Sequence, residues 1–188
     1  MNVPLIGLAG AARSGKDTAA QALLDLGWTR RAFADKVRDM LYAMNPTLAD
    51  EAYFEGTTSL AYEVDTYGWN EVKEQHPEVR QMLQRLGTEG GRAILGESVW
   101  VDALFRDFES WDIPTVITDV RFPNEAKAIR ARGGLVVAVE RPGQTLIHEA
   151  EHVSENALAG FLFDDVIRND GPVSRLHDRV MQLIPLAM

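Results

Sequence analysis

The sequence predicts an α/β fold in which a mostly parallel sheet carries helices on both faces. Short apolar runs alternate with longer amphipathic segments, so expected strands and helices follow one another along the chain. Parallel strands require a crossover element to return the chain, and a helix usually fills this role. In addition, the first expected strand and helix are joined by a glycine-rich turn, an arrangement that binds phosphate groups.

The first expected strand covers Val3 to Ala9, because an almost continuous apolar run is typical of a strand buried on both faces. Glycines between positions 10 and 15 end this run. The next three elements follow from apolar spacing and flanking turn residues, and they are a helix over 17–26, a short strand over 29–33 and a helix over 35–44.

The stretch over 47–77 carries aromatic residues among acidic and small ones without a sustained period, so we expect a partly irregular insertion there. Gly87 and the Gly90-Gly91 pair are expected to interrupt the helical structure on either side of them. The remaining expected elements are helices over 78–86, 98–108, 124–132 and 172–184, and strands over 115–118, 135–140 and 165–168.

The composition is typical of one compact domain with a full core, with 188 residues, 46% of them hydrophobic and 25% charged. A net charge of -9 argues against a surface that binds a nucleic-acid polymer, although a small anionic ligand needs only a few local cations. The absence of cysteine excludes a disulfide scaffold and a thiolate metal site. No basic leader and no apolar run near the ~18 residues of a membrane span is present, so we expect a cytoplasmic protein.

The segment from Gly10 to Thr18 reads GAARSGKDT and matches the G-x-x-x-x-G-K core of the Walker A motif. Gly10 and Gly15 permit backbone conformations that aim successive N–H groups inward, and the helix N-terminus adds positive potential. Lys16 supplies a mobile cation for the β- and γ-phosphates of ATP. The expected ATP-binding residues of this loop are Ala12, Arg13, Ser14, Gly15, Lys16, Asp17 and Thr18.

Asp17 stands where the motif usually has serine or threonine, and the hydroxyl comes one place later, at Thr18. A carboxylate is a hard oxygen ligand that suits Mg²⁺, so Asp17 is expected to hold the metal directly or through water, while Thr18 bonds a phosphate. The alternative is that Asp17 only places negative charge in the first turn of the helix.

Further motifs give the chain a resemblance to the phage-type deoxynucleoside monophosphate kinases, relatives of dephospho-CoA kinase in the P-loop kinase group. The segments that carry it are GKDT at 15–18, FADK at 33–36, LQRLGTE at 83–89 with Arg92 and Trp100, DVRFPNE at 119–125, HVSE at 152–155 and IRNDG at 167–171. Each is modest alone, but their order along one chain is specific. The resemblance implies a P-loop kinase fold over 1–188 with a five-stranded parallel sheet, ATP bound on the glycine loop, and a helical, acceptor-binding insertion over about 45–110.

Three charged residues are expected to act in phosphoryl transfer. Asp119 ends a buried strand, where open α/β sheets bind ligands, so it is expected to reach Mg²⁺ or its waters, or else to cap the following turn. Arg121 is expected to neutralise charge on the transferring phosphoryl group, with a surface salt bridge as the alternative. Asp35 is expected to end the second strand, and either to orient the acceptor and magnesium or to cap the next helix.

The acceptor is expected to bind in the middle third of the chain. Arg80 and Gln84 are four residues apart, so one helix face can present a guanidinium to the α-phosphate and an amide to a base edge. Trp69 and Trp100 offer aromatic faces for stacking, although the surroundings of Trp100 favour core packing. The expected acceptor-binding residues are Lys36, Trp69, Arg80, Gln84, Thr88 and Arg92.

Two features near the C-terminus have simpler alternatives. Asn169 opens a turn that resembles the one beside the adenine in related kinases, so it is expected to contact ATP, although a plain turn explains it as well. His148 and His152 are four apart among glutamates, but no third nitrogen ligand is evident, and a solvated surface is the expected outcome.

These features predict ATP-dependent phosphorylation of a deoxynucleoside 5'-monophosphate to the diphosphate, with Mg²⁺ and no covalent intermediate. The alternatives are a dephospho-CoA or other small-molecule kinase, and a non-catalytic NTP-binding switch, against which the absence of an Asn-Lys-x-Asp motif argues. The expected partners are small-molecule nucleotides, with neither a nucleic-acid polymer nor a membrane. If the chain is phage-encoded, it is expected in the host cytoplasm, and the dimers of relatives leave a homodimer open.

Overall fold

The computed structural model describes residues 3–49, 56–143 and 157–187. The chain divides into two compact units. The sheet unit consists of Met1–Phe33 and Leu104–Met188, and the helical unit consists of Ala34–Ala103. His148 and His152 lie outside the described residues.

The sheet unit is built on a five-stranded sheet in the order β2-β5-β1-β6-β7. All four strand pairs are parallel, which confirms the predicted parallel sheet. Every residue of the central strand β1 is buried, and this double-sided burial explains its continuous apolar sequence. The strands are β1 (Leu5–Ala9), β2 (Thr29–Arg31), β5 (Thr115–Val120), β6 (Leu135–Glu140) and β7 (Asp165–Arg168).

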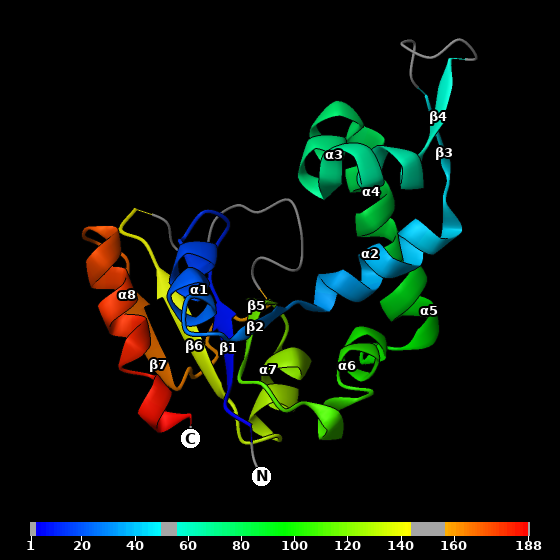
Figure 1. Cartoon of the computed structure of the whole chain (residues 1–188). Coiled ribbons are helices and arrows are strands. Elements are labelled where there is room, and N and C mark those ends of the chain that lie inside the picture. The colour runs from blue at the N-terminus through cyan, green and yellow to red at the C-terminus, as the bar shows by residue number, and fades with distance from the viewer. Residues whose placement is uncertain (1–2, 50–55, 144–156, 188) are drawn as a thin grey trace. The chain divides into compact units, whose positions relative to one another are not determined.

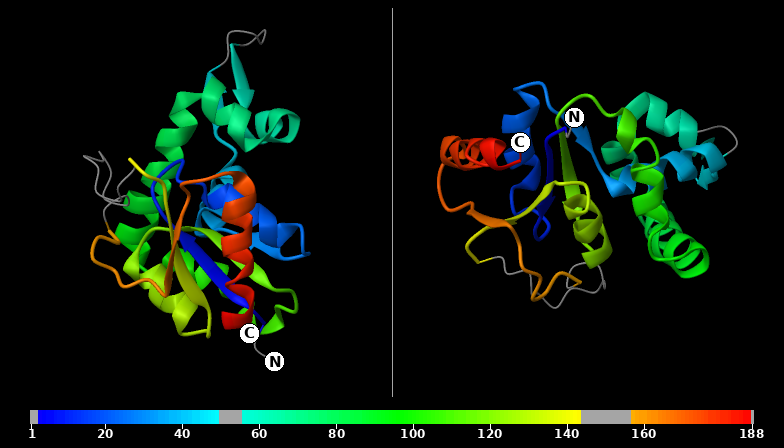
Figure 2. Two further views of the ribbon diagram at one scale, coloured as in Figure 1. Left: turned by 90° about the vertical axis from the view of Figure 1, so that its left-hand side faces the viewer. Right: turned by 90° about the horizontal axis from the view of Figure 1, so that it is seen from below.

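Helices cover both faces of this sheet, as Figures 1 and 2 show. Helices α1 (Lys16–Leu24) and α8 (Val173–Met181) pack side by side on the face to which Ile6 and Leu8 point. Because side chains alternate along a strand, Gly7 points to the opposite face, where α7 (Pro123–Arg130) lies. A Cβ on Gly7 would lie 2.5 Å from Ile129 Cδ1, so glycine is what lets α7 approach the sheet.

The helical unit has its own core, in which Leu41, Leu48, Leu60, Val72 and Val79 are buried together. Its elements, with the two helices that cross its ends, are α2 (Phe33–Met44), β3 (Thr47–Ala49), β4 (Thr57–Ser59), α3 (Leu60–Gln75), α4 (Pro77–Arg85), a π-helical turn (Leu86–Arg92), α5 (Ala93–Leu95) and α6 (Val99–Leu104). Short 3₁₀ turns at Phe108–Ser110 and Ile184–Leu186 belong to the sheet unit.

For the described residues 47–49 and 57–75, which lie in strands and a helix, the expectation of a partly irregular insertion is wrong. Strands β3 and β4 form an antiparallel pair, and α3 follows with Ser59 as its N-cap, because Ser59 Oγ accepts a hydrogen bond from the Tyr62 amide at 3.3 Å. The sequence shows no sustained helical period because Gly68 interrupts α3, with φ 78° and ψ 159°. The apolar residues on its two sides therefore follow different phases.

The expected break at Gly87 and Gly90-Gly91 is also wrong, because the π-helical turn carries the helical path through them. A Cβ on Gly91 would lie 2.4 Å from the Trp100 ring, so this glycine makes room for the indole. Trp100 is 5% exposed and its Nε1 donates to the Gly87 carbonyl at 2.7 Å. Core packing of Trp100 is therefore confirmed.

Over the described ranges, none of the helices has both the length and the apolar character that a membrane crossing requires.

Candidate active site

The loop between β1 and α1 curls tightly. Gly10 has φ 148° and Gly15 has φ 105°, and Arg13 between them has φ 61°, in the left-handed region that L side chains rarely adopt. A non-glycine residue held there costs about 1–3 kcal/mol, and such strain is concentrated at binding sites. A Cβ on Gly10 would lie 2.4 Å from the Val139 carbonyl oxygen, so the loop is also held close to β6.

Lys16 closes the inside of this curl. Its Nζ donates hydrogen bonds to the carbonyl oxygens of Gly10 at 2.8 Å and Ala11 at 2.7 Å. The ammonium group therefore lies against its own loop. A phosphate that enters the loop would replace these neutral carbonyl acceptors with charged oxygens, which accept stronger hydrogen bonds. Ser14 is buried beside it, and its hydroxyl makes no hydrogen bond within the described part of the chain.

A cavity of about 340 Å³ joins this loop to the turn that connects β7 with α8. Cationic side chains lie at the loop and after β6, while Val173 and Leu176 provide an apolar wall. The lining residues are Arg13, Gly15, Lys16, Asp17, Thr18, Arg141, Asn169, Gly171, Val173 and Leu176. Six of the expected ATP-binding residues thus meet in one cavity, whereas Ala12 and the buried Ser14 are not part of its lining.

Sequence reasoning missed Arg141, although it directly follows β6 and so lies at the same sheet edge as the glycine loop. A larger hollow of about 560 Å³ is present at the edge strand β7, lined by Glu140, Val166, Arg168, Asp170, Arg175 and Arg179. Its lining carries three arginines and two carboxylates, with Arg175 paired to Asp170 at 3.4 Å, and no residue of the glycine loop belongs to it. The smaller cavity is therefore the candidate nucleotide site.

The carboxylates that could meet magnesium are few. Asp17 is exposed in the first turn of α1. Among the residues that the structure describes, no group of three or more histidines or carboxylates is arranged to hold a metal ion. Mg²⁺ commonly binds through one or two carboxylates together with waters and phosphate oxygens, so this sparse set suits it.

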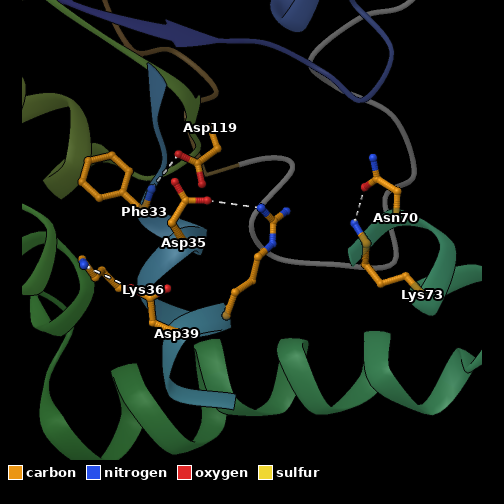
Figure 3. A network of polar contacts seen from close by, with 8 residues as sticks. Phe33, Asp35, Lys36, Asp39, Asn70, Lys73 and Asp119 are labelled. Atoms are coloured by element: carbon orange, nitrogen blue, oxygen red, sulfur yellow. Dashed lines mark hydrogen bonds and ion pairs between the residues drawn. The ribbon is translucent and has the colours of Figure 1, made fainter. Parts of the chain in front are cut away.

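Asp119 lies within β5, next to the strand that leads into the glycine loop, because its neighbour Val120 pairs with Ala9. Its Oδ1 accepts a hydrogen bond from the Phe33 amide at 2.8 Å (Figure 3). Phe33 is the first residue of α2, so Asp119 supports the start of that helix.

Arg121 is exposed just beyond β5, and its side chain makes no hydrogen bond or ion pair with any residue in the described ranges. The surface salt bridge considered as its alternative role is therefore not seen there. The buried Glu125 holds its backbone, since Oε2 accepts from the amides of Arg121 at 2.7 Å and Phe122 at 3.0 Å. Sequence reasoning missed this role of Glu125, although a glutamate at the third position of a helix is a capping signal.

In the helical unit, Asp35 lies in the first turn of α2 and not at a strand end, because β2 ends at Arg31. It cannot be the N-cap either, since the helix has already begun at Phe33. Its Oδ1 accepts from Arg38 Nη1 at 3.2 Å. Lys36, one residue on, is paired with Asp39 at 3.1 Å within the same helix (Figure 3).

A cationic cluster formed by Arg38, Lys73 and Arg80 was not found by sequence reasoning, apart from Arg80. Burial lowers the pKa of Lys73 below its ordinary value of 10.5, and the positive charges of Arg38 and Arg80 lower it further, against a smaller opposite effect of Glu74. Arg80 Nε donates to the Lys73 carbonyl at 2.9 Å. Lys73 Nζ donates to Asn70 Oδ1 at 3.1 Å (Figure 3). The cluster draws on α2, α3 and α4, so no local pattern reveals it.

The other expected acceptor residues differ in their exposure and in their contacts. Arg80 and Gln84 are both exposed on α4, as their spacing predicts. Thr88 is half-buried in the π-helical turn, and Arg92 donates to the Glu97 carbonyl at 2.9 Å. Trp69 is half-buried against the core of the helical unit.

A sequence model of the deoxynucleotide monophosphate kinase family matches residues 64–180. A protein of Acanthamoeba polyphaga mimivirus, named as a deoxynucleotide monophosphate kinase, is 30% identical over 96% of this chain and 95% of its own. The deoxynucleoside-5'-monophosphate kinase of Escherichia phage T5 is 26% identical over 98% and 97%. The solved structure of TT1252 from Thermus thermophilus, 17% identical over 100% of both chains with a TM-score of 0.50, supports the fold alone. This chain therefore belongs to the deoxynucleotide monophosphate kinase family, a family of phosphotransferases.

Proposed function

We propose that the protein transfers the γ-phosphoryl group of ATP to a deoxynucleoside 5'-monophosphate and so forms the diphosphate. The observation that carries this proposal is the cavity of about 340 Å³ at the glycine loop, which combines loop amides, three cationic side chains and an apolar wall. The loop amides and the cationic side chains suit phosphate groups, and the apolar wall suits a base. Membership of the family implies the use of ATP.

On the donor side, Lys16 leaves the carbonyls of Gly10 and Ala11 and follows the β- and γ-phosphates. Arg13 and Arg141, which line the same cavity, offset further phosphate charge. Because the transferring group spreads negative charge over its oxygens, catalysis here consists of positioning and electrostatic stabilisation. Arg121 is the proposed cation for this charge, and its exposed, unengaged guanidinium among the described contacts favours that role.

Mg²⁺ is part of the proposal because hard carboxylate oxygens are at hand. Asp17 in the first turn of α1 and Asp119 in the strand beside β1 are the proposed ligands, directly or through water. Bound there, the ion would supply charge compensation for the β- and γ-phosphate oxygens. The hydrogen bond from Phe33 keeps the Asp119 carboxylate in a fixed orientation.

On the acceptor side, the cluster of Arg38, Lys73 and Arg80 is the proposed holder of the monophosphate. Bringing three cations together costs free energy, which an anion placed among them recovers. Asp35 orients Arg38 through their ion pair. The further proposed acceptor contacts are Lys36, Trp69, Gln84, Thr88 and Arg92.

A coupled assay of ADP release tests the proposal across the four deoxynucleoside monophosphates, with dephospho-CoA as the competing acceptor. We expect turnover with at least one deoxynucleoside monophosphate and none with dephospho-CoA. Lys16→Ala should lower turnover by about 10²–10³-fold, the cost of removing one preorganised stabilising group. Lys127→Ala, which removes an exposed lysine on α7, is the matched control. ATP turnover that no nucleoside monophosphate accelerates would instead identify a switch.

A further inference from the structure

Asn169 lies at the end of β7, and its side chain bonds the glycine loop across a separation of 155 residues. Its Nδ2 donates to the Ser14 carbonyl at 2.9 Å, while its own amide donates to the Glu140 carbonyl at 2.7 Å. The second bond fixes Asn169 to the sheet, so the first bond ties the loop to the sheet as well.

The hydrogen bond from Asn169 Nδ2 to the Ser14 carbonyl, called the tie below, also fixes the direction of the next backbone amide. A peptide group is planar and trans, so its C=O and N–H point in opposite directions. Because Asn169 draws the Ser14 carbonyl toward itself, the N–H of Gly15 must point away from Asn169. Gly15 lines the nucleotide cavity, and its N–H has no acceptor in the part of the chain that the structure describes. It is a donor held ready for an anionic oxygen.

Gly15 itself is constrained by the same contact. A Cβ on Gly15 would lie 2.4 Å from Asn169 Nδ2, so a side chain at this position would displace the amide that makes the tie. A second link comes from α8, where His177 Nε2 lies 3.1 Å from the Thr18 carbonyl. The turn after β7 and helix α8 thus contact the loop and the first turn of α1 through their side chains. Helix α8 lies beside α1 (Figure 1).

We propose that Asn169 is a positioning residue, which aims the Gly15 amide at the phosphates of the donor nucleotide instead of contacting the adenine. This inference rests on the proposed function only in taking ATP as the ligand of the cavity. It differs from the expectation drawn from the sequence, in which Asn169 contacts ATP beside the base.

The test is calorimetric binding of ATP and of inorganic tripolyphosphate to the whole chain and to Asn169→Ala. Tripolyphosphate has no base, so loss of an aimed amide should weaken both ligands alike, by about five- to tenfold, the usual effect of one hydrogen bond. Asn169→Asp should weaken both more, because a carboxylate cannot donate to Ser14 and repels phosphate. A contact with adenine would instead leave tripolyphosphate binding unchanged, and this result would overturn the proposal.

Asp170→Ala is the matched control, because it changes the next residue of the same turn and removes only the ion pair with Arg175. Equal losses in Asn169→Ala and Asp170→Ala would show that the turn as a whole matters and not the tie. Asn169→Ser, whose side chain is too short to reach Ser14, repeats the test if the alanine variant does not fold. A wild-type chain that binds ATP but phosphorylates no deoxynucleotide refutes the proposed function and leaves this inference standing.

Discussion

At the scale of single residues, Lys73, a proposed binding group, lowers the stability of the folded chain. Its pKa is lowered by burial and by the charges of Arg38 and Arg80, so the folded state holds this proton less tightly than the unfolded chain does. The unfolded state therefore binds more protons between the lowered pKa and 10.5, and stability rises with pH across that window. At pH values below this window, including neutral pH, the folded state bears the full free-energy cost of keeping Lys73 charged.

Lys73→Met should therefore raise the free energy of unfolding near pH 7, by less than about 1 kcal/mol because the group is partly exposed. The same change should raise the KM for the deoxynucleotide and leave the KM for ATP unchanged. Urea unfolding at pH 7 and steady-state kinetics check the two parts. Lys127→Met, which removes an exposed lysine on α7 outside the proposed acceptor site, is the control for loss of a lysine without this crowding. A less stable variant with normal acceptor affinity would contradict the role of Lys73.

Arg121 and Glu125 should act as one unit. Arg121→Ala is expected to lower kcat about 10²-fold or more while changing ATP affinity little, since the contact is proposed to strengthen in the transition state. Glu125→Ala removes the carboxylate that holds the Arg121 and Phe122 amides, so it should also lower kcat. In the double variant the two losses should not add, because Glu125 acts through Arg121. Full additivity would show that Glu125 only caps α7.

At the scale of elements, the π-helical turn explains why glycines lie inside a helical path. Gly91 faces Trp100, whereas a Cβ on Gly90 would have its nearest neighbour at 3.6 Å, an ordinary contact. Gly91→Ala should therefore destabilise the protein by about 1–3 kcal/mol through overpacking. Gly90→Ala should be neutral or stabilising by up to about 1 kcal/mol, because alanine favours helix. Thermal unfolding of the two variants measures both effects, and equal destabilisation by the two substitutions would refute the packing explanation.

At the scale of the whole molecule, the sheet was predictable because strands buried on both faces carry a continuous apolar signal, as in β1 and β6. The glycine loop was predictable because the residues of its motif are contiguous between Gly10 and Thr18. The cluster of Arg38, Lys73 and Arg80 was not, since it needs the packing of three helices. Helix α3 escaped detection because Gly68 resets its period.

The tie from Asn169 to Ser14 was equally beyond the sequence, since it joins residues 155 positions apart. The turn motif around Asn169 marks the residue as one of interest, but the direction of an amide side chain depends on how β7 lies in the sheet. Contiguous motifs thus reveal where a ligand binds, and the supports of that motif emerge only when distant elements are placed together.

The two compact units lead to a prediction for the whole chain. If the sheet unit binds ATP and the helical unit binds the deoxynucleotide, each ligand alone should slow amide hydrogen exchange in its own unit. A non-hydrolysable ATP analogue should protect the glycine loop and the β7–α8 turn, and the deoxynucleotide should protect α2, α3 and α4. At a ligand concentration of about 100 times Kd, the bound unit gains about 2.7 kcal/mol, so amides that exchange by unfolding should slow about 100-fold.

Hydrogen exchange followed by mass spectrometry resolves these segments in one experiment. Lys16→Ala should abolish only the protection by the ATP analogue, and Lys73→Met should weaken only the protection by the deoxynucleotide, because each variant removes a cation from one unit. The sheet core is the internal reference, since its buried strands exchange slowly in every state. Protection of the helical unit by the ATP analogue alone, with no change at the glycine loop, would reverse the proposed assignment of donor and acceptor.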